Sequence, residues 1–377
     1  MRFFNIDLHV SVIEDVATQL RALGHGVESH LMSGHCWALA KERASRGTSE
    51  GKDGKVGYGS INMETWEELF HDMPTLEKIK RWQKENPQLA AFDGFIATYP
   101  PAFALLYDAF PGHTILQIPV RYDLHFTEDP TAWRAFNARL VNAQDAGRLT
   151  VVANNLYDAN YYNYFTGRPA LHISNTCDYI DEHTPKWSPR GTDKLLAFGE
   201  HAGCRALAKS LHNVFFVRDV LDQYTHREII RALGVVWIPY NCSVMSFFEH
   251  YWLNIPLFVP SQTLLFRLWK YEMALSQLSW HRTLGGGSNI GSMNTFTSDP
   301  HSVEGIRQWM RLYDFYNEDE FPHITYFDSW DDLETKIASA PFTSISESMA
   351  KHNLLRRKRN LDAWREILSR IVPVNGS

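Results

Sequence analysis

The chain has 377 residues, of which 44% are hydrophobic and 21% are charged. That length predicts two globular domains, and that composition can fill a large hydrophobic core. The formal net charge of −6 argues against a general nucleic-acid-binding protein, because such proteins need a basic surface that releases counterions from phosphate.

The cysteines and the apolar segments indicate the cellular compartment in which the protein works. Four cysteines are scattered without a CxxC pair, at positions 36, 177, 204 and 242, which disfavours both a disulfide scaffold and a structural zinc site. The first residues reach polar side chains too early for a signal peptide, and no apolar stretch approaches the ~20 residues that span a bilayer. We expect a cytoplasmic protein without a transmembrane segment, and peripheral contact with a membrane stays open.

The first half of the chain alternates strand and helix patterns. Phe3–Ile6 reads as a short buried strand, and apolar residues from Val10 to Leu23 recur at helical spacing. Further strand patterns lie at 27–31, 92–97, 114–120, 149–153 and 170–173, and further helical patterns at 102–109, 132–146 and 156–165. Repeated βαβ units predict a parallel sheet whose ligands bind at the carboxyl ends of its strands.

A second block of alternating patterns follows a polar stretch, 179–190, that suits an interdomain linker. Its strand patterns lie at 195–198, 214–217, 235–238 and 256–259, and its helical patterns at 225–233 and 244–253. The glycine-rich segment at Gly285–Ser288 suits a loop better than a phosphate cradle. A long helix at about 346–371 carries a basic run, for which a solvated helix face is the simplest interpretation.

These patterns together predict an α/β protein with two Rossmann-like domains that face each other across a cleft. The first domain covers 1–178 and the second 190–345. The last segment, 346–377, forms a helix that crosses back and packs on the first domain.

Within the second block, Val235–Pro260 resembles the donor-binding unit of GT-B glycosyltransferases of the large group 1 type. In that family a strand leads to a loop with a first glutamate, and a second glutamate lies eight residues later on a helix before a proline-containing strand. Glu249, seven residues before Pro256, matches the second glutamate, which in the family binds the ribose of the donor. A carboxylate suits this role because it accepts two hydrogen bonds from a vicinal diol.

The chain departs from this family at the first glutamate, where it has Asn241. Cys242, Ser243 and Val244 replace the glycines that follow. The resemblance implies that Asn241 contacts the donor sugar and that Ser243 caps the helix whose N-terminus holds the diphosphate. Tyr240 is placed to stack on the nucleotide base. The departure leaves open both the identity of the donor and the choice between inversion and retention.

Two more passages are similar to the same family. Residues 150–178 resemble the end of its acceptor domain, where Asn175 and Asp178 match the outer positions of an N-G-V-D ending. Residues 327–333 resemble the entry into its late helices. The resemblance therefore covers much of the chain.

A departing nucleoside diphosphate develops negative charge, so cations of the second domain should stabilise it. Arg205 and Lys209 lie four residues apart, on one face of an expected helix, and are the first candidates. Arg218 and His201 are alternatives. For each of these cations an ordinary surface position is the competing interpretation.

The loop after the first strand holds the candidate base. His9 precedes a helix there, inverting GT-B enzymes often carry a histidine at this point, and imidazole can deprotonate an acceptor hydroxyl near neutral pH. Asp7 is either the base itself or the residue that orients His9. Capping of the helix N-terminus is the structural alternative for both.

A polar group follows the strand at 114–120. Asp123 is a further candidate base or partner of the base, and a structural Arg–Asp pair is the alternative. Three residues are candidate acceptor ligands: Tyr99, Arg121 and His125. Four of these candidate residues could together bind a metal ion, because Asp and His are common metal ligands: Asp7, His9, Asp123 and His125. The resemblance instead implies metal-independent chemistry, and no D-x-D motif occurs in the sequence.

The expectation from the sequence is a glycosyltransferase that moves a sugar from a nucleotide-diphosphate sugar, of UDP or GDP type, to a saccharide acceptor. Displacement at the anomeric carbon would need no cofactor, and His9 favours inversion. Two alternatives remain. A nucleotide-sugar epimerase of the same fold would consume the donor without an acceptor, and a non-catalytic sugar-binding protein would bind saccharides only.

Overall fold

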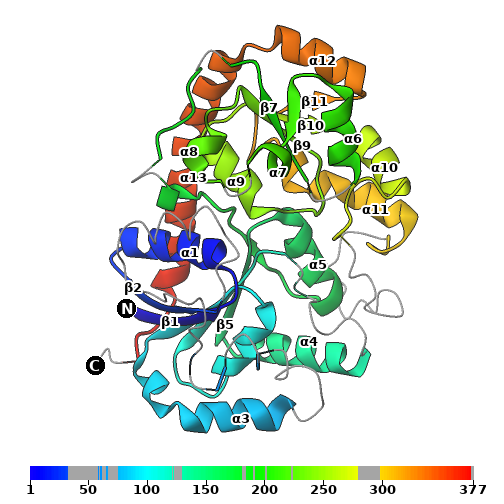
Figure 1. Ribbon diagram of the computed structural model, residues 1–377. Helices are drawn as coiled ribbons and strands as arrows, with labels where there is room; N and C mark the ends of the chain where they lie inside the picture. Colours follow the sequence, from blue (N-terminus) through cyan, green and yellow to red (C-terminus); the bar gives the residue numbers. More distant parts are fainter. Residues whose placement is uncertain are drawn as a thin grey trace.

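The computed structural model describes residues 1–32, 58, 60–61, 65–66, 75–120, 122, 130–180, 184–189, 192–199, 202–221, 224–278 and 298–374. These residues form two parallel β-sheets, of six and five strands, that are flanked by helices (Figure 1). The expected α/β architecture with two Rossmann-like halves is therefore confirmed. No helix within these ranges is both long and apolar enough to cross a lipid bilayer.

The first sheet has the strand order β2-β1-β3-β4-β5-β6. Its strands are β1 (Arg2–Asp7), β2 (Gly26–Leu31), β3 (Gly94–Ala97), β4 (His113–Ile118), β5 (Leu149–Ala153) and β6 (Leu171–His172). Side chains alternate between its two faces, as the period of a strand requires. One face packs Phe3, Ile96 and Ile115 against α1 (Val10–Ala22) and the last helix, α13 (Phe342–Ser369), while Phe4 and Phe95 belong to the larger core on the other face.

The helices of this half are α1 (Val10–Ala22), α3 (Thr75–Glu85), η2 (Pro87–Ala91), η3 (Pro101–Tyr107), α4 (Pro130–Asp145), α5 (Leu156–Thr166) and η4 (Asp178–Ile180). The segment expected to be helical at 102–109 forms the 3-10 helix η3. Asn155 caps α5, because its side-chain oxygen accepts a hydrogen bond from the backbone N–H of Asp158 at 2.7 Å. Gly167 ends α5 in the left-handed conformation, with φ of 67°.

The second sheet has the order β11-β10-β9-β7-β8. Its strands are β7 (Leu195–Phe198), β8 (Val214–Phe216), β9 (Gly234–Trp237), β10 (Leu257–Pro260) and β11 (Thr325–Phe327). Its helices are α6 (Ala202–Ser210), α7 (Val217–Val220), α8 (His226–Ile229), α9 (Met245–Trp252), α10 (Gln262–Lys270), α11 (Val303–Trp309), η5 (Met310–Leu312), η6 (Asp314–Tyr316) and α12 (Trp330–Ser339). The helix expected at 225–233 is shorter and ends at Ile229. Gly234 is required by close packing, since a Cβ there would lie 2.9 Å from the Pro256 carbonyl oxygen.

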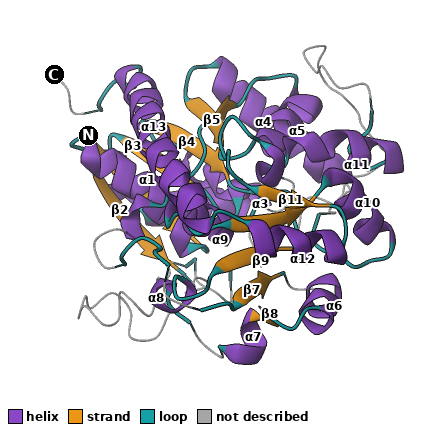
Figure 2. Cartoon of the chain, turned by 90° about the horizontal axis from the view of Figure 1, so that it is seen from above, coloured by secondary structure: helices purple, strands orange, loops and turns teal. Residues whose placement is uncertain are grey.

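The last helix, α13 (Phe342–Ser369), contacts both halves of the molecule (Figures 1 and 2). Near its start, the ring of Phe342 lies 5.9 Å from that of Phe258 in β10. Near its end, Trp364 and Ile367 pack in the same core cluster as Ile13 of α1. The helix begins four residues before the expected position, and it runs from the second half back to the first.

The two halves also meet through α5 and the segment around α11. The ring of Tyr157 lies 5.3 Å from that of Trp309 and 5.7 Å from that of Tyr313. The hydroxyl of Tyr161 lies 2.9 Å from Nε2 of His301. These contacts place the beginning of α5 beside the chain that precedes η6.

Candidate functional site

Each sheet has one point at which its strand order reverses, and ligands of doubly wound sheets bind at the carboxyl ends of the strands there. In the first sheet this point lies between β1 and β3. Asp7 ends β1, His9 follows it, and Tyr99 follows β3. Three residues singled out from the sequence therefore come together at the switch point of the first sheet.

Asp7 fastens the two loops of this switch point to each other. Its side chain is fully buried, and its carboxylate accepts hydrogen bonds from the backbone N–H groups of His9 at 2.7 Å and Tyr99 at 3.1 Å. The hydroxyl of Thr98 donates a third bond. Burial raises the pKa of Asp7 to about 7, against the opposing effect of these bonds. Asp7 thus fixes the backbone positions of His9 and Tyr99 relative to each other.

His9 occupies the N-cap position of α1, but its side chain makes no capping hydrogen bond. Nδ1 of its half-buried imidazole lies 3.1 Å from the hydroxyl of Ser11, and its ring meets the ring of Tyr99 edge-on at 6.1 Å. A ring nitrogen of the imidazole can accept the proton of an acceptor hydroxyl. Its contact with Asp7 is through the backbone, so the carboxylate positions the residue through the main chain.

Several of the expected site residues lie outside the described part of the chain. Arg121, Asp123 and His125 follow β4 but are not among the described residues, and the same holds for His201 and for Gly285–Ser288. The four-residue metal alternative cannot be assembled for that reason. Among the residues that the structure describes, no three His, Cys, Asp or Glu side chains are grouped to hold a metal ion.

The switch point of the second sheet lies between β7 and β9, and Tyr240 and Asn241 follow β9. Asn241 is buried, and its side-chain oxygen accepts a hydrogen bond from the backbone N–H of Cys242 at 2.8 Å. Tyr240 is half-buried. The expectation that Ser243 caps α9 is wrong, because Val244 occupies the N-cap position and makes no side-chain cap. Ser243 is itself buried and lies beside Asp314.

Glu249, on α9, is buried with 3% of its surface exposed. The hydroxyl of Tyr179 donates to one carboxylate oxygen at 2.6 Å, and Nε2 of His226 lies 3.2 Å from the other. Burial raises the pKa of Glu249, but these two partners and the nearby His250 outweigh it and hold the pKa below its usual value. The carboxylate is therefore ionised. It connects α9 to Tyr179, at the start of the expected linker, and to His226 of α8.

The basic candidates of the second half lie on its surface. Arg205 and Lys209 share α6, as the sequence predicted, and both are exposed, as is Arg218 on α7. The guanidinium of Arg205 lies 3.2 Å from the carboxylate of Asp219 and 4.4 Å from the ring centroid of Phe216. This pairing places Arg205 over β8, at the edge of the sheet.

At the meeting point of α5 and η6 the structure adds Asp314, a buried polar residue that sequence reasoning missed. Asp314 is fully buried, and its carboxyl group lies beside the side chain of Ser243. Burial raises its pKa well above the usual range, against the opposing effect of the adjacent Ser243 side chain, and nearby Asp158 raises it further. Asn175 Nδ2 lies 3.4 Å from the sulfur of Met245, which begins α9. Asp314 therefore lies beside the loop that precedes α9, where burial favours its protonated form.

Near this meeting point Asn175 carried a sequence signal, through its match to the family's N-G-V-D ending. Asp314 carries no such signal, because its segment has no strand or helix pattern that points toward the first half. Comparisons with known proteins add no assignment: no protein-family model matches the chain, and no curated protein matches it.

Proposed function

We propose that this chain is a glycosyltransferase of GT-B architecture, which transfers a sugar from a nucleotide-diphosphate sugar to a saccharide acceptor without a metal or other cofactor. The observation that carries the proposal is that polar and aromatic side chains lie at the switch points of both sheets. His9 and Tyr99 stand at the first, and Tyr240 and Asn241 at the second. Two such sheets offer one site for the acceptor and one for the donor.

In this proposal His9 is the general base and Asp7 is its positioning residue. The acceptor hydroxyl oxygen attacks the anomeric carbon while the imidazole takes the hydroxyl proton. The bond from the anomeric carbon to the diphosphate oxygen breaks, and its electron pair leaves with the diphosphate. Direct displacement of this kind inverts the anomeric centre. Tyr99, Arg121 and His125 would contact the acceptor, and Asp123 would support the base.

On the donor side, Glu249 would bind the ribose and Tyr240 would stack on the base. Both oxygens of Glu249 already have partners, so the ribose hydroxyls would replace the Tyr179 hydroxyl as hydrogen-bond donors. Asn241 would contact the sugar, and the N-terminus of α9, which begins at Met245, would hold the diphosphate together with the preceding Ser243.

The departing charge would be stabilised by the exposed cations Arg205, Lys209 and Arg218. An exposed ion pair such as Arg205–Asp219 contributes at most about 1 kcal/mol, so its guanidinium is released at little cost. A reducing, cytoplasmic location is part of the proposal: among the described residues, Cys177, Cys204 and Cys242 are buried and are not joined in disulfides.

Nucleotide binding tests the donor half of the proposal. UDP or GDP should raise the melting temperature of the wild type, because a ligand at 100 times its Kd stabilises a protein by about 2.7 kcal/mol. Glu249→Gln should abolish this response. Tyr179→Phe is the matched variant: it should keep the response, since it removes only the group that the ribose displaces. A wild type that responds to no nucleotide contradicts the proposal, and an unchanged response in Glu249→Gln removes Glu249 from the donor site.

A further inference from the structure

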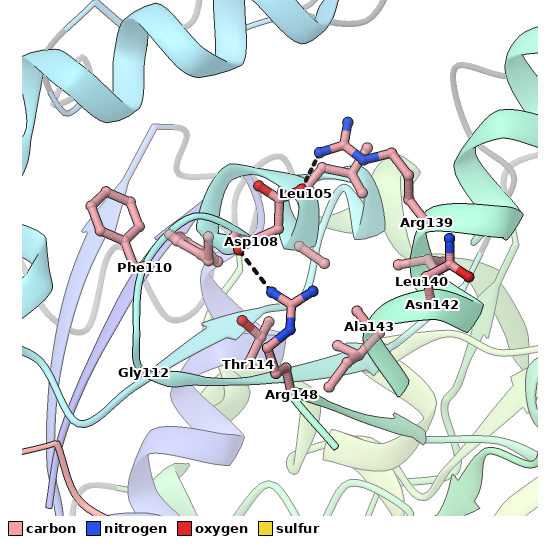
Figure 3. A pocket seen from close by; sticks show the side chains of 13 residues that line it. Leu105, Asp108, Phe110, Gly112, Thr114, Arg139, Leu140, Asn142, Ala143 and Arg148 are labelled. Carbon is pink, nitrogen blue, oxygen red and sulfur yellow. Dashed lines mark hydrogen bonds and ion pairs between the residues drawn. The ribbon is translucent and has the colours of Figure 1, made fainter. Parts of the chain in front are cut away.

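A pocket of about 130 Å³ lies in the first half, between η3, the second part of α4 and the beginnings of β4 and β5 (Figure 3). Thr114 is near the start of β4 and Leu149 begins β5, and both line it. The pocket is therefore at the amino ends of the strands. His9 and Tyr99 follow the carboxyl ends of β1 and β3, so the pocket and the candidate site lie at opposite ends of the strands of this sheet.

Three charged side chains line this pocket, namely Asp108, Arg139 and Arg148. Arg139 donates to the Asp108 carboxylate, and Nη1 of Arg148 donates to the Asp108 backbone carbonyl at 2.9 Å. Figure 3 shows the two guanidinium groups approaching Asp108 from different sides. Two cations against one carboxylate leave a net positive charge, and each guanidinium carries five N–H donors, more than these bonds use.

The remaining wall is largely apolar and includes Leu105, Leu140, Ala143 and Leu149. A dry cavity of about 150 Å³ accommodates benzene, so a pocket of this size takes a group of about six non-hydrogen atoms. Guanidinium groups recognise carboxylates and phosphates by paired, charge-assisted hydrogen bonds. The geometry points to an anion-binding site that is separate from the candidate active site.

We propose that this pocket binds a small anion whose oxygens meet Arg139 and Arg148 and whose apolar body packs on Leu140 and Leu149. The class that fits both features is a short-chain carboxylate, and a phosphoryl group shares the same recognition. The Asp108 carboxylate competes with the ligand for the guanidinium of Arg139. The site is independent of the proposed sugar transfer, because none of its residues takes part in that reaction.

Isothermal titration calorimetry with butyrate, acetate and inorganic phosphate tests this proposal on the full chain. Butyrate, which has six non-hydrogen atoms, should bind the wild type more tightly than acetate, because it also fills the apolar wall. Arg148→Gln should weaken binding at least tenfold, while Arg134→Gln, an exposed change on α4, should have no effect. Asp108→Asn should tighten binding because it removes the competing charge.

The same measurements show whether the preferred anion is a carboxylate or a phosphoryl group. They also define the results that would overturn the proposal. Phosphate binding that depends on Arg148 and exceeds butyrate binding supports the site with a phosphoryl ligand. The proposal is overturned if none of the three anions binds the wild type at millimolar concentration. It is equally overturned if binding is the same in Arg148→Gln and in the wild type. Because Arg148 is exposed, its substitution tests the site without disturbing the core.

Discussion

Asp7 and Asp15 are fully buried carboxyl groups of the first half, and burial raises the pKa of each to about 7. Asp15, on α1, accepts hydrogen bonds from the backbone N–H of Cys177 at 2.6 Å and the hydroxyl of Thr176 at 3.2 Å. It thereby holds the chain that leaves the first sheet. Gln19 donates a further bond to it at 2.9 Å.

Asp15→Asn should reduce the pH dependence of stability. Between about pH 4 and pH 7 the unfolded chain has lost the Asp15 proton that the folded chain keeps, so the free energy of unfolding falls as pH rises, by up to about 1.4 kcal/mol per pH unit. Asparagine stays neutral, and its N–H can donate to the side-chain oxygen of Gln19, which has no partner among the described residues.

The measurement is denaturant unfolding of wild type and Asp15→Asn at pH 4.5 and pH 7.5. The variant should gain stability relative to the wild type as the pH is raised, because only the wild type has to ionise the buried carboxyl group. The same difference at both pH values would show that Asp15 does not titrate in this range.

At the scale of single residues, the sequence predicted which residues lie at the ends of strands, but it did not predict their side-chain contacts. The positions of Asp7, His9 and Asn241 follow from strand patterns that the structure reproduces. The contact of Glu249 with Tyr179 and His226 could not be predicted, because the three belong to separate elements and no periodic pattern relates them. Asp314 was missed for the same reason, since its burial depends on how the two halves meet.

At the scale of elements, buried strands were the most predictable feature. The strands Leu149–Ala153 and Leu195–Phe198 have the bounds that their sequences indicated, since continuous apolar runs mark strands buried on both faces. Helix α3, Thr75–Glu85, was missed because it is rich in charged residues and buries few side chains. Strand β11, Thr325–Phe327, has three residues, which is too short for a periodic signal.

The crossing helix α13 depends on one buried cation. Arg356 is fully buried on it and donates to the backbone carbonyl of Asn175 at 2.7 Å and to the side-chain oxygen of Asn353 at 2.8 Å. Its Nε lies 3.5 Å from the carboxylate of Glu320. The guanidinium therefore joins the end of the first half, α13 and the segment after η6.

Arg356→Gln should lower the free energy of unfolding by about 3 kcal/mol, because removing one member of a buried ion pair leaves its partners unsatisfied. Lys358→Gln, an exposed change two residues away on the same helix, should change it by less than about 0.5 kcal/mol. Denaturant unfolding of both variants measures the difference. Equal and small effects would mean that Arg356 does not stabilise the crossing.

At the scale of the whole molecule, the two sheets repeat one topology. Reading the second sheet from β8 gives β8-β7-β9-β10-β11, the same relative order as β2-β1-β3-β4-β5 in the first. The sequence predicted two α/β halves and a returning helix. It could not predict that α5 and α11 would pack together, because that contact depends on aromatic side chains more than a hundred residues apart, such as Tyr157 and Trp309.

The most direct test of the proposed transfer is the release of nucleoside diphosphate from UDP- and GDP-sugars, measured with and without saccharides and followed by mass spectrometry of the products. We predict release that requires a saccharide and a product heavier by one glycosyl unit. His9→Ala should slow it by about 10²- to 10⁴-fold, while His212→Ala, an exposed histidine of the second half, should not. Release without any saccharide would indicate an epimerase, and saccharide binding with no release would indicate a binding protein; either result would contradict sugar transfer.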